Sequence, residues 1–260
     1  MPNSQNIETF IQSQLNSKFI GRQLHYYPTL TSTMEVAKKM AREGAAEGTV
    51  VIADEQTSGR GRLDRVWLSP KGSLAMSIIL QPHLNNLHQL IMVASLAVVH
   101  AIKKIANLEA QIKWPNDILI KGKKVCGILI ESEVKGSGVN FAIIGIGINV
   151  NFNPSAFPEI SDIATSLSHE LGKEVLKTDL TVTLLSEVEQ LYLEAQAGAP
   201  IYREWQKHME TLGKFIQVKI GESVEQGKAE NVTANGNLTL RRADGSLAAI
   251  VAGDVTVIKD

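Results

Sequence analysis

The stretch from residue 112 to residue 149 constrains the fold most, because apolar runs bounded by turn residues fill most of it. The last two of these runs are joined by the turn-prone segment Lys135-Gly136-Ser137-Gly138. Shorter runs of the same kind come earlier in the chain. The strand candidates are Leu24–Tyr27, Thr49–Ala53, Ser73–Leu80, Ile112, Ile118–Ile120, Val125–Val134 and Val139–Asn149. The sequence therefore predicts a β-sheet in the main part of the chain.

Apolar residues at helical spacing occur between these strands and on both sides of them. Residues 7–15 predict a short first helix. Ser32 followed by Glu35 has the form of a capping box, which predicts a helix that begins there and ends at Gly44. Further helices are predicted over Leu87–Asn107, Thr178–Ala197 and Ile201–His208. Charged and polar residues interrupt the first of these, so we expect it to pack on the core rather than span a membrane.

The end of the chain has a different pattern. Residues 213–260 read as short strands broken by Asn235-Gly236 and Asp244-Gly245, which are strong hairpin signals. They predict a small β-barrel domain. A length of 260 residues allows one sizeable domain and a small one, so we expect domains over residues 1–211 and 212–260.

The composition excludes several classes of protein. A net charge of -1 argues against a general nucleic-acid binder, which needs a broad excess of lysine and arginine. The single cysteine excludes an intramolecular disulfide, and the six histidines show no pairing at metal-ligand spacing, so no metal ligands are predicted. The amino terminus lacks the profile of a signal peptide. We expect a cytoplasmic protein with no nucleic-acid or membrane partner.

A loop rich in glycine and arginine, from Gln56 to Arg65, is the most informative segment for function. Its glycines allow a close approach of the backbone to a ligand, while Arg60, Arg62 and Arg65 supply guanidinium groups for a carboxylate or a phosphate. A solvated basic turn is the alternative for such a loop taken alone. A Walker-type phosphate loop does not occur in the sequence, so nucleotide binding cannot rest on that motif.

Two further segments combine ordinary turn or strand chemistry with functional groups. The segment KWPND at residues 113–117, followed by Lys124, brings together groups suited to activating an acid with a triphosphate, although Pro-Asn-Asp is also a common turn. Gly145 and Gly147 leave room for a flat or bulky group, although packing against a helix would also explain them. Cys126 is expected to pack as a small apolar residue.

Taken in order, these segments closely resemble the biotin-protein ligase family. The resemblance rests on Ser-Thr at residues 32–33, then GRGRLDRVWLSPKGS, KWPNDILI, KVCGILIE and GIGINVN. It implies an α+β fold of the class II synthetase and biotin ligase type, with a mixed sheet backed by helices and a C-terminal Src-homology-3-like barrel. The implied enzyme is a biotin-[acetyl-CoA-carboxylase] ligase, which uses ATP to form biotinyl-5′-AMP and then biotinylates a lysine of a biotin carboxyl carrier protein.

The resemblance also implies roles for individual residues. Lys124, Asp117, Arg62 and Lys113 would be catalytic, with Lys124 at the biotin carboxylate and Asp117 and Asn116 toward the acceptor lysine. Biotin would contact Ser32, Thr33, Gln56, Gly59, Arg60, Lys124 and Gly127. ATP would contact Arg62, Arg65, Trp67, Lys113, Asn116 and Asn149. Mg²⁺ would bind largely through the triphosphate, and a homodimer stays open as an alternative to a monomer.

The sequence departs from the family pattern at Asp64, where glycine is usual, and we expect fewer loop conformations there. Family members that are also repressors carry an amino-terminal helix-turn-helix domain, and the residues before the first motif are too few for one. A ligase without that domain is expected. Two alternatives stay open: a lipoate- or octanoate-protein ligase, and a non-catalytic biotin sensor. The GRGR loop and KWPND favour biotin.

Overall fold

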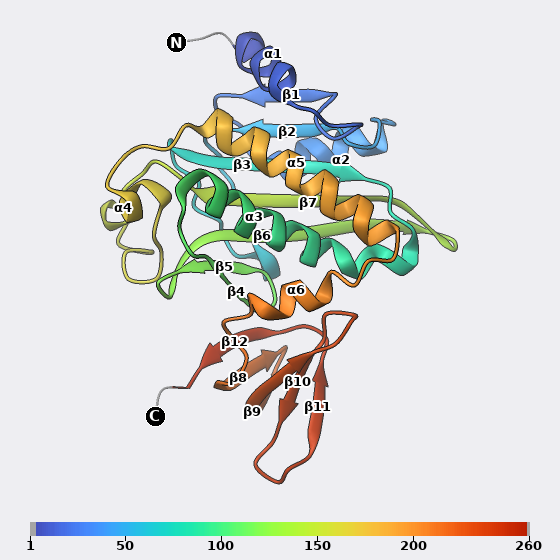
Figure 1. Cartoon of the computed structure of the whole chain (residues 1–260), viewed down its shortest axis with the longest axis vertical. Helices are drawn as coiled ribbons and strands as arrows, with labels where there is room; N and C mark the ends of the chain where they lie inside the picture. The colour runs from blue at the N-terminus through green and yellow to red at the C-terminus, as the bar shows by residue number, and fades with distance from the viewer. Residues whose placement is uncertain (1–3, 259–260) are drawn as a thin grey trace.

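A seven-stranded mixed sheet forms the larger part of the protein (Figure 1). The structure, a computed structural model, describes residues 4–258 apart from the side chain of Asp64, so the expectation for that side chain lies outside the described residues. The strands are β1 (Leu24–Tyr27), β2 (Val50–Ala53), β3 (Ser73–Leu80), β4 (Gln111–Lys113), β5 (Asp117–Ile120), β6 (Lys123–Lys135) and β7 (Gly138–Asn149). Their order is β1-β2-β3-β7-β6-β5-β4. Strands β1 and β2 are parallel, and the remaining neighbours are antiparallel.

Helices cover both faces of this sheet. Figure 1 shows α3 and α5 side by side across one face, with α2 behind the sheet. The helices are α1 (Ser4–Gln14), α2 (Thr33–Arg42), α3 (Leu90–Ala106), α4 (Leu167–Leu171), α5 (Lys177–Gln196) and α6 (Tyr202–Lys207), with 3₁₀ turns η1 (Arg62–Asp64), η2 (Leu84–Gln89) and η3 (Pro154–Ala156). The α+β class is thus confirmed.

The alternation of side chains along the strands divides the core between the two faces. Val50 and Ile52 join the large apolar cluster under α3 and α5, whereas Val51 joins a smaller cluster with Met34 of α2 and Ile143 of β7. Successive strand residues point to opposite faces. Since both faces are covered, these strands read as continuous apolar runs rather than as an alternating pattern.

The apolar segment Leu84–Ala106, which comprises η2 and α3, is long and apolar enough to cross a membrane by length and composition alone. In the folded chain, 67% of its most apolar window is buried inside the protein. It packs against α5 and the sheet, as Figure 1 shows. It is therefore a core helix, as its polar interruptions predict.

A second, five-stranded antiparallel sheet lies at the opposite end of the protein from α1 (Figure 1). Its strands are β8 (Phe215–Ile220), β9 (Ser223–Val232), β10 (Leu238–Arg241), β11 (Leu247–Ile250) and β12 (Asp254–Val257), in the order β11-β10-β9-β8-β12. Gly236 and Gly245 have φ values of 82° and 84° in the two turns where hairpins are expected. The all-β character of this region is confirmed, and a division of domains after residue 211 stays a prediction.

The prediction of a capping box at the start of α2 is wrong, although the helix does begin there and does end before Gly44. Ser32 is the N-cap residue, but its side chain makes no capping hydrogen bond. The Oε1 atom of Gln56 instead accepts a hydrogen bond from the Thr33 backbone N–H at 2.8 Å. Glu35 pairs with Arg60 rather than with the helix end. A side chain from outside the helix therefore replaces the local cap.

The short helix α4 was not predicted from the sequence, because five residues are too few to show a helical period of apolar side chains.

Candidate active site

A cavity of about 530 Å³ opens between α2, the Gly/Arg loop and strands β6 and β7, with segment 159–164 and Asp254 at its edge. Most of the residues expected from the sequence to bind ligands line it. These are Ser32, Thr33, Gln56, Arg60, Arg62, Arg65, Trp67, Asn116, Lys124, Gly127 and Asn149. Three expected residues, Gly59, Lys113 and Asp117, lie outside the lining. The tertiary structure thus brings segments from five parts of the chain around one cavity.

Glycines on neighbouring strands make the floor of the cavity. Gly127 of β6 and Gly147 of β7 are partners in the sheet. A Cβ atom at Gly147 would lie 2.5 Å from the indole nitrogen of Trp67, and one at Gly127 would lie 3.0 Å from the same ring. Gly145 similarly makes room for the sulfur of Met34. These glycines therefore leave space for side chains of the protein itself, namely the Trp67 ring and the Met34 sulfur.

Polar atoms of Ser32, Thr33 and Gln56 gather at one end of the cavity. The Gln56 carbonyl accepts hydrogen bonds from the Thr33 backbone N–H and hydroxyl, at 2.8 and 3.2 Å. Ser32 is 2% exposed, and its hydroxyl makes no hydrogen bond within the described residues. A buried hydroxyl without a partner costs free energy unless a ligand or water satisfies it. This end of the cavity is built to receive a polar group.

The three loop arginines are held by carboxylates and carbonyls from distant segments. Arg60 pairs with Glu35 of α2 and lies 3.7 Å from Glu131 of β6. Arg65 pairs with Asp254 at the start of β12. The remaining arginine of the loop, Arg62, is 3.9 Å from the same carboxylate. The loop is therefore tied both to the sheet and to the second β region.

Lys124 and Asp117 form an ion pair at the cavity wall. The Nζ atom of Lys124 lies 2.6 Å from Oδ1 of Asp117, and their side chains are 30% and 24% exposed. The same ammonium lies 5.2 Å from the centre of the Trp67 ring, which is within the range of a cation–π contact. One positive charge is thus held between a carboxylate and an aromatic face.

The two asparagines of the site hold other groups in place. Asn116 accepts a hydrogen bond from Arg62 at 3.0 Å and donates one to the Ile128 carbonyl at 2.8 Å. Asn149 is 3% exposed and donates to the Thr165 carbonyl at 2.9 Å. Both amides therefore hold groups of the cavity wall in place by these hydrogen bonds.

Cys126, although it lies beside this site, is fully buried in the core. Burial raises the pKa of its thiol well above the usual value. A neutral thiol in an apolar setting behaves as a small hydrophobic group, as its sequence context predicts.

Sequence reasoning missed two sets of residues. Asp254 follows the Gly/Arg loop by about 190 positions, and no local pattern connects it with Arg65. His100, Glu204 and His208 come together away from the cavity, although the histidine spacing along the chain suggested no cluster. Only the packing of α3 against α6 shows it.

Comparisons with known proteins agree with this geometry. Residues 26–149 match the model of the Biotin/lipoate A/B protein ligase family. The chain is 39% identical over 244 residues to the bifunctional ligase/repressor BirA of Bacillus subtilis, with 92% of the chain and 75% of that protein covered. It is 34% identical to the biotin-[acetyl-CoA-carboxylase] ligase of Paracoccus denitrificans, with 82% of the chain and 92% of that protein covered.

A solved structure extends the likeness to the fold. The biotin protein ligase from Aquifex aeolicus in complex with biotin and ATP matches with a TM-score of 0.79 at 29% identity, covering 92% of the chain and 100% of that structure. Fold and cavity define a member of the biotin and lipoate ligases. Within that class, the chain belongs to the biotin-protein ligase family.

Proposed function

We propose that the chain is an ATP-dependent biotin-[acetyl-CoA-carboxylase] ligase, which converts biotin to biotinyl-5′-AMP and then transfers the biotinyl group to a lysine of a biotin carboxyl carrier protein. One observation carries the proposal. A single cavity joins a buried polar end at Ser32 and Gln56 to a wall of cationic side chains, Arg60, Arg62 and Lys124. Such a cavity suits an acid with a polar head group that reacts with a nucleotide.

In the first step the biotin carboxylate attacks the α-phosphorus of ATP, and pyrophosphate leaves. Ser32, Thr33 and Gln56 would hydrogen-bond the ureido group of biotin at the polar end. Arg60 and Gly127 would line its path, with Gly59 supporting the loop from outside the lining, and Lys124 would lie beside its carboxylate. A fixed ammonium at this point stabilises the negative charge that develops on the reacting oxygens.

On the nucleotide side, Arg62 and Arg65 would bind the phosphates, because their guanidinium groups match phosphate oxygens. Both face the carboxylate of Asp254, which triphosphate would have to displace or share. Trp67, Asn116, Asn149 and Lys113 would complete this side. Lys113 lies on β4, opposite Asp117 in the sheet, and would balance charge from outside the cavity wall.

Mg²⁺ fits this cavity as a companion of ATP. The lining includes the carboxylates of Glu159 and Asp254, and this ion binds through one or two carboxylates together with substrate phosphates. When bound, it would neutralise charge on the triphosphate and help pyrophosphate to leave. Arg62 and Arg65 would orient the triphosphate for the reaction.

In the second step the carrier lysine must attack as a neutral amine, although the ordinary pKa of lysine, about 10.4, leaves it protonated at neutral pH. Asp117 would position this amine and accept its proton, and Asn116 would support the approach. The carboxylate lies just outside the cavity lining, and its side chain is 24% exposed.

We propose the cytoplasm, where ATP is available, as the compartment of this enzyme. A homodimer stays an alternative to a monomer, and light scattering measures which of the two forms in solution.

The decisive experiment is exchange of labelled pyrophosphate into ATP with biotin, with lipoate or with neither. Exchange that depends on biotin is expected, followed by labelling of a carrier domain when one is supplied. Exchange with lipoate alone would instead identify a lipoate ligase. Biotin binding without exchange would identify a sensor.

A further inference from the structure

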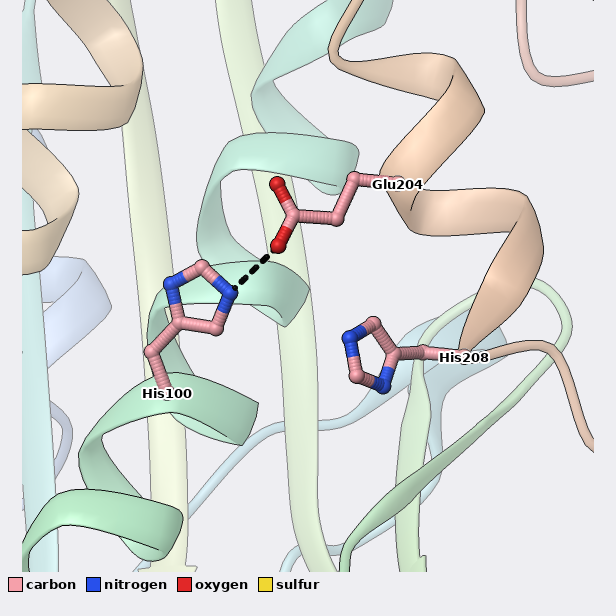
Figure 2. Close-up of side chains that lie close together, drawn as sticks. All are labelled: His100, Glu204 and His208. Carbon is pink, nitrogen blue, oxygen red and sulfur yellow. Dashed lines mark hydrogen bonds and ion pairs between the residues drawn. The ribbon is translucent and has the colours of Figure 1, made fainter.

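Three side chains outside the cavity, His100, Glu204 and His208, converge between α3 and α6 (Figure 2). Their possible ligand atoms all lie within 4.8 Å of one another. Glu204 belongs to α6 and His208 caps its C-terminal end, so that these side chains, four positions apart, share one helix face. Two imidazoles and a carboxylate form a ligand set that zinc and related metals prefer.

A buried carboxylate stands behind His100. Its Nδ1 atom lies 2.9 Å from Oε2 of Glu187, whose side chain is 8% exposed. The other oxygen of Glu187 pairs with Lys104 at 2.6 Å. Histidines that bind metals usually donate their second ring N–H to a carboxylate, which fixes the tautomer and the direction of the ring. Glu187 therefore directs the Nε2 atom of His100 toward the other two side chains.

The second nitrogen of His100 also faces a carboxylate. Its Nε2 atom lies 2.9 Å from Oε1 of Glu204, as the dashed line in Figure 2 marks. A neutral imidazole has only one N–H and can donate to only one of these two carboxylates, whereas a metal ion at Nε2 would interact with both the imidazole and Glu204. The ring of His208 lies edge-on to that of His100, with 6.3 Å between their centroids, so a metal ion at this point would have a third ligand within reach.

We propose that His100, Glu204 and His208 bind one divalent transition-metal ion, best Zn²⁺, with water in the fourth position. Ligand atoms on a tetrahedral zinc ion lie roughly 3.3 Å apart, given metal–ligand distances of about 2.0–2.1 Å. The contact between His100 and Glu204, at 2.9 Å, must therefore lengthen slightly, while the ring of His208 moves closer to them. The Glu204 side chain is 46% exposed, so it can rotate to do this without disturbing the core.

Such an ion would fasten α6 to α3 near the edge of the main sheet. The carbonyl of His208 already accepts a hydrogen bond from Ile112 of β4 at 2.8 Å. The three ligands are absent from the cavity lining, so the site is independent of ATP and of the Mg²⁺ that accompanies it. An ion that binds only the folded chain raises its unfolding temperature.

The test uses the tag-free chain, stripped of metal and kept without biotin or ATP. Zn²⁺ binding is measured by titration calorimetry, and Co²⁺ is added in parallel because its visible absorption reports four-coordinate geometry. We expect one ion per chain, and at least a tenfold weaker affinity in His208→Ala and in Glu204→Gln. Glu187→Gln should weaken binding about tenfold to a hundredfold through its effect on His100. His169→Ala removes an exposed histidine elsewhere and should bind as the parent does.

Glu204→Gln keeps the shape of an exposed side chain, so its result does not depend on a change in folding. Affinities in Glu204→Gln and His208→Ala equal to that of the parent would overturn the proposal. So would the absence of saturable Zn²⁺ binding by the parent chain.

Discussion

The ammonium of Lys124 lies 2.6 Å from the carboxylate of Asp117, so the two residues assigned to successive steps of the reaction form one ion pair. The sequence separates them by one turn, and the antiparallel pairing of β5 with β6 brings them together. Each residue therefore affects the position of the other. Variants at both positions have to be compared step by step.

Lys124→Ala should abolish most adenylate formation, by roughly 10²–10³-fold, because a single positioned charge at a developing anion commonly contributes that much. The free energy of unfolding should change by less than about 1 kcal/mol, since the pair is partly exposed. Single-turnover synthesis of biotinyl-5′-AMP measures the effect. Lys123→Ala, an exposed neighbour on the same strand, is the control. Parental rates in Lys124→Ala would remove this residue from the first step.

Asp117→Asn should separate the two steps. It keeps the size of the side chain but removes the charge that orients Lys124, so adenylate formation should fall about tenfold. Transfer to the carrier lysine should fall further, by roughly 10²–10³-fold, since proton acceptance by a positioned group contributes on this order. Both rates are measured in single turnovers, the second from preformed adenylate. Equal losses would mean that Asp117 acts only through Lys124.

Biotin should protect the loop at Gly59–Arg65 from trypsin. Leu63 is 70% exposed and cannot anchor the loop, and ion pairs to Asp254 hold it instead. Asp254→Ala should therefore raise cleavage after Arg65 by up to about fivefold without ligand, because exposed pairs contribute up to about 1 kcal/mol.

A saturating hundredfold excess of biotin over its dissociation constant should then slow cleavage by up to roughly a hundredfold. Asp244→Ala, in an exposed turn of the same sheet, serves as the matched variant. A cleavage rate that changes neither with biotin nor with the Asp254 substitution would contradict the closing of this loop. Protection by lipoate would favour the alternative ligase.

Gly147→Ala should displace the indole of Trp67, because its Cβ would lie 2.5 Å from the ring nitrogen. Overpacking of this kind costs about 1–3 kcal/mol, which urea unfolding can measure, and ATP binding should weaken with it. Gly138→Ala is the control on the same strand, where a Cβ meets no atom within 4 Å. If the two variants behave alike, Trp67 does not depend on this glycine.

Glu170 should make stability depend on pH. Burial acts to raise the pKa of this carboxyl, but the Thr165 hydroxyl at 2.6 Å and the Lys121 ammonium at 2.9 Å outweigh it and lower the pKa below the usual value. Its stabilisation is therefore complete above the unfolded pKa, about 4.3, and is lost as the pH falls through the folded pKa.

The free energy of unfolding of Glu170→Gln should be about 1 kcal/mol lower than that of the parent at pH 7. At pH 3 the two free energies should differ little. Denaturant unfolding at both values tests this. A difference that does not depend on pH would show that the charge of Glu170 contributes nothing.

Much of the secondary structure was readable from the sequence, because strand runs and helical spacing are local. Strand β1 was predicted at its observed bounds, and α3 and α5 to within a few residues. The glycines of GIGIN indicated a close approach but not what approaches, since Trp67 comes from a loop about eighty residues earlier. The capping box at Ser32 matched a local rule and was wrong, because Gln56 caps the helix from outside it.

The sequence by itself determined which chemical groups the site has, since its motifs carry their arginines, lysines and glycines in a recognisable order. Only the tertiary structure decided which groups meet. Asp254 reaches the loop arginines because the second sheet lies against the first, and His100 meets His208 because α3 packs on α6. Charges and ligands act over a few ångströms of space, whatever their separation along the chain. Local patterns predict helices and strands, whereas pairs of distant residues depend on how those elements pack.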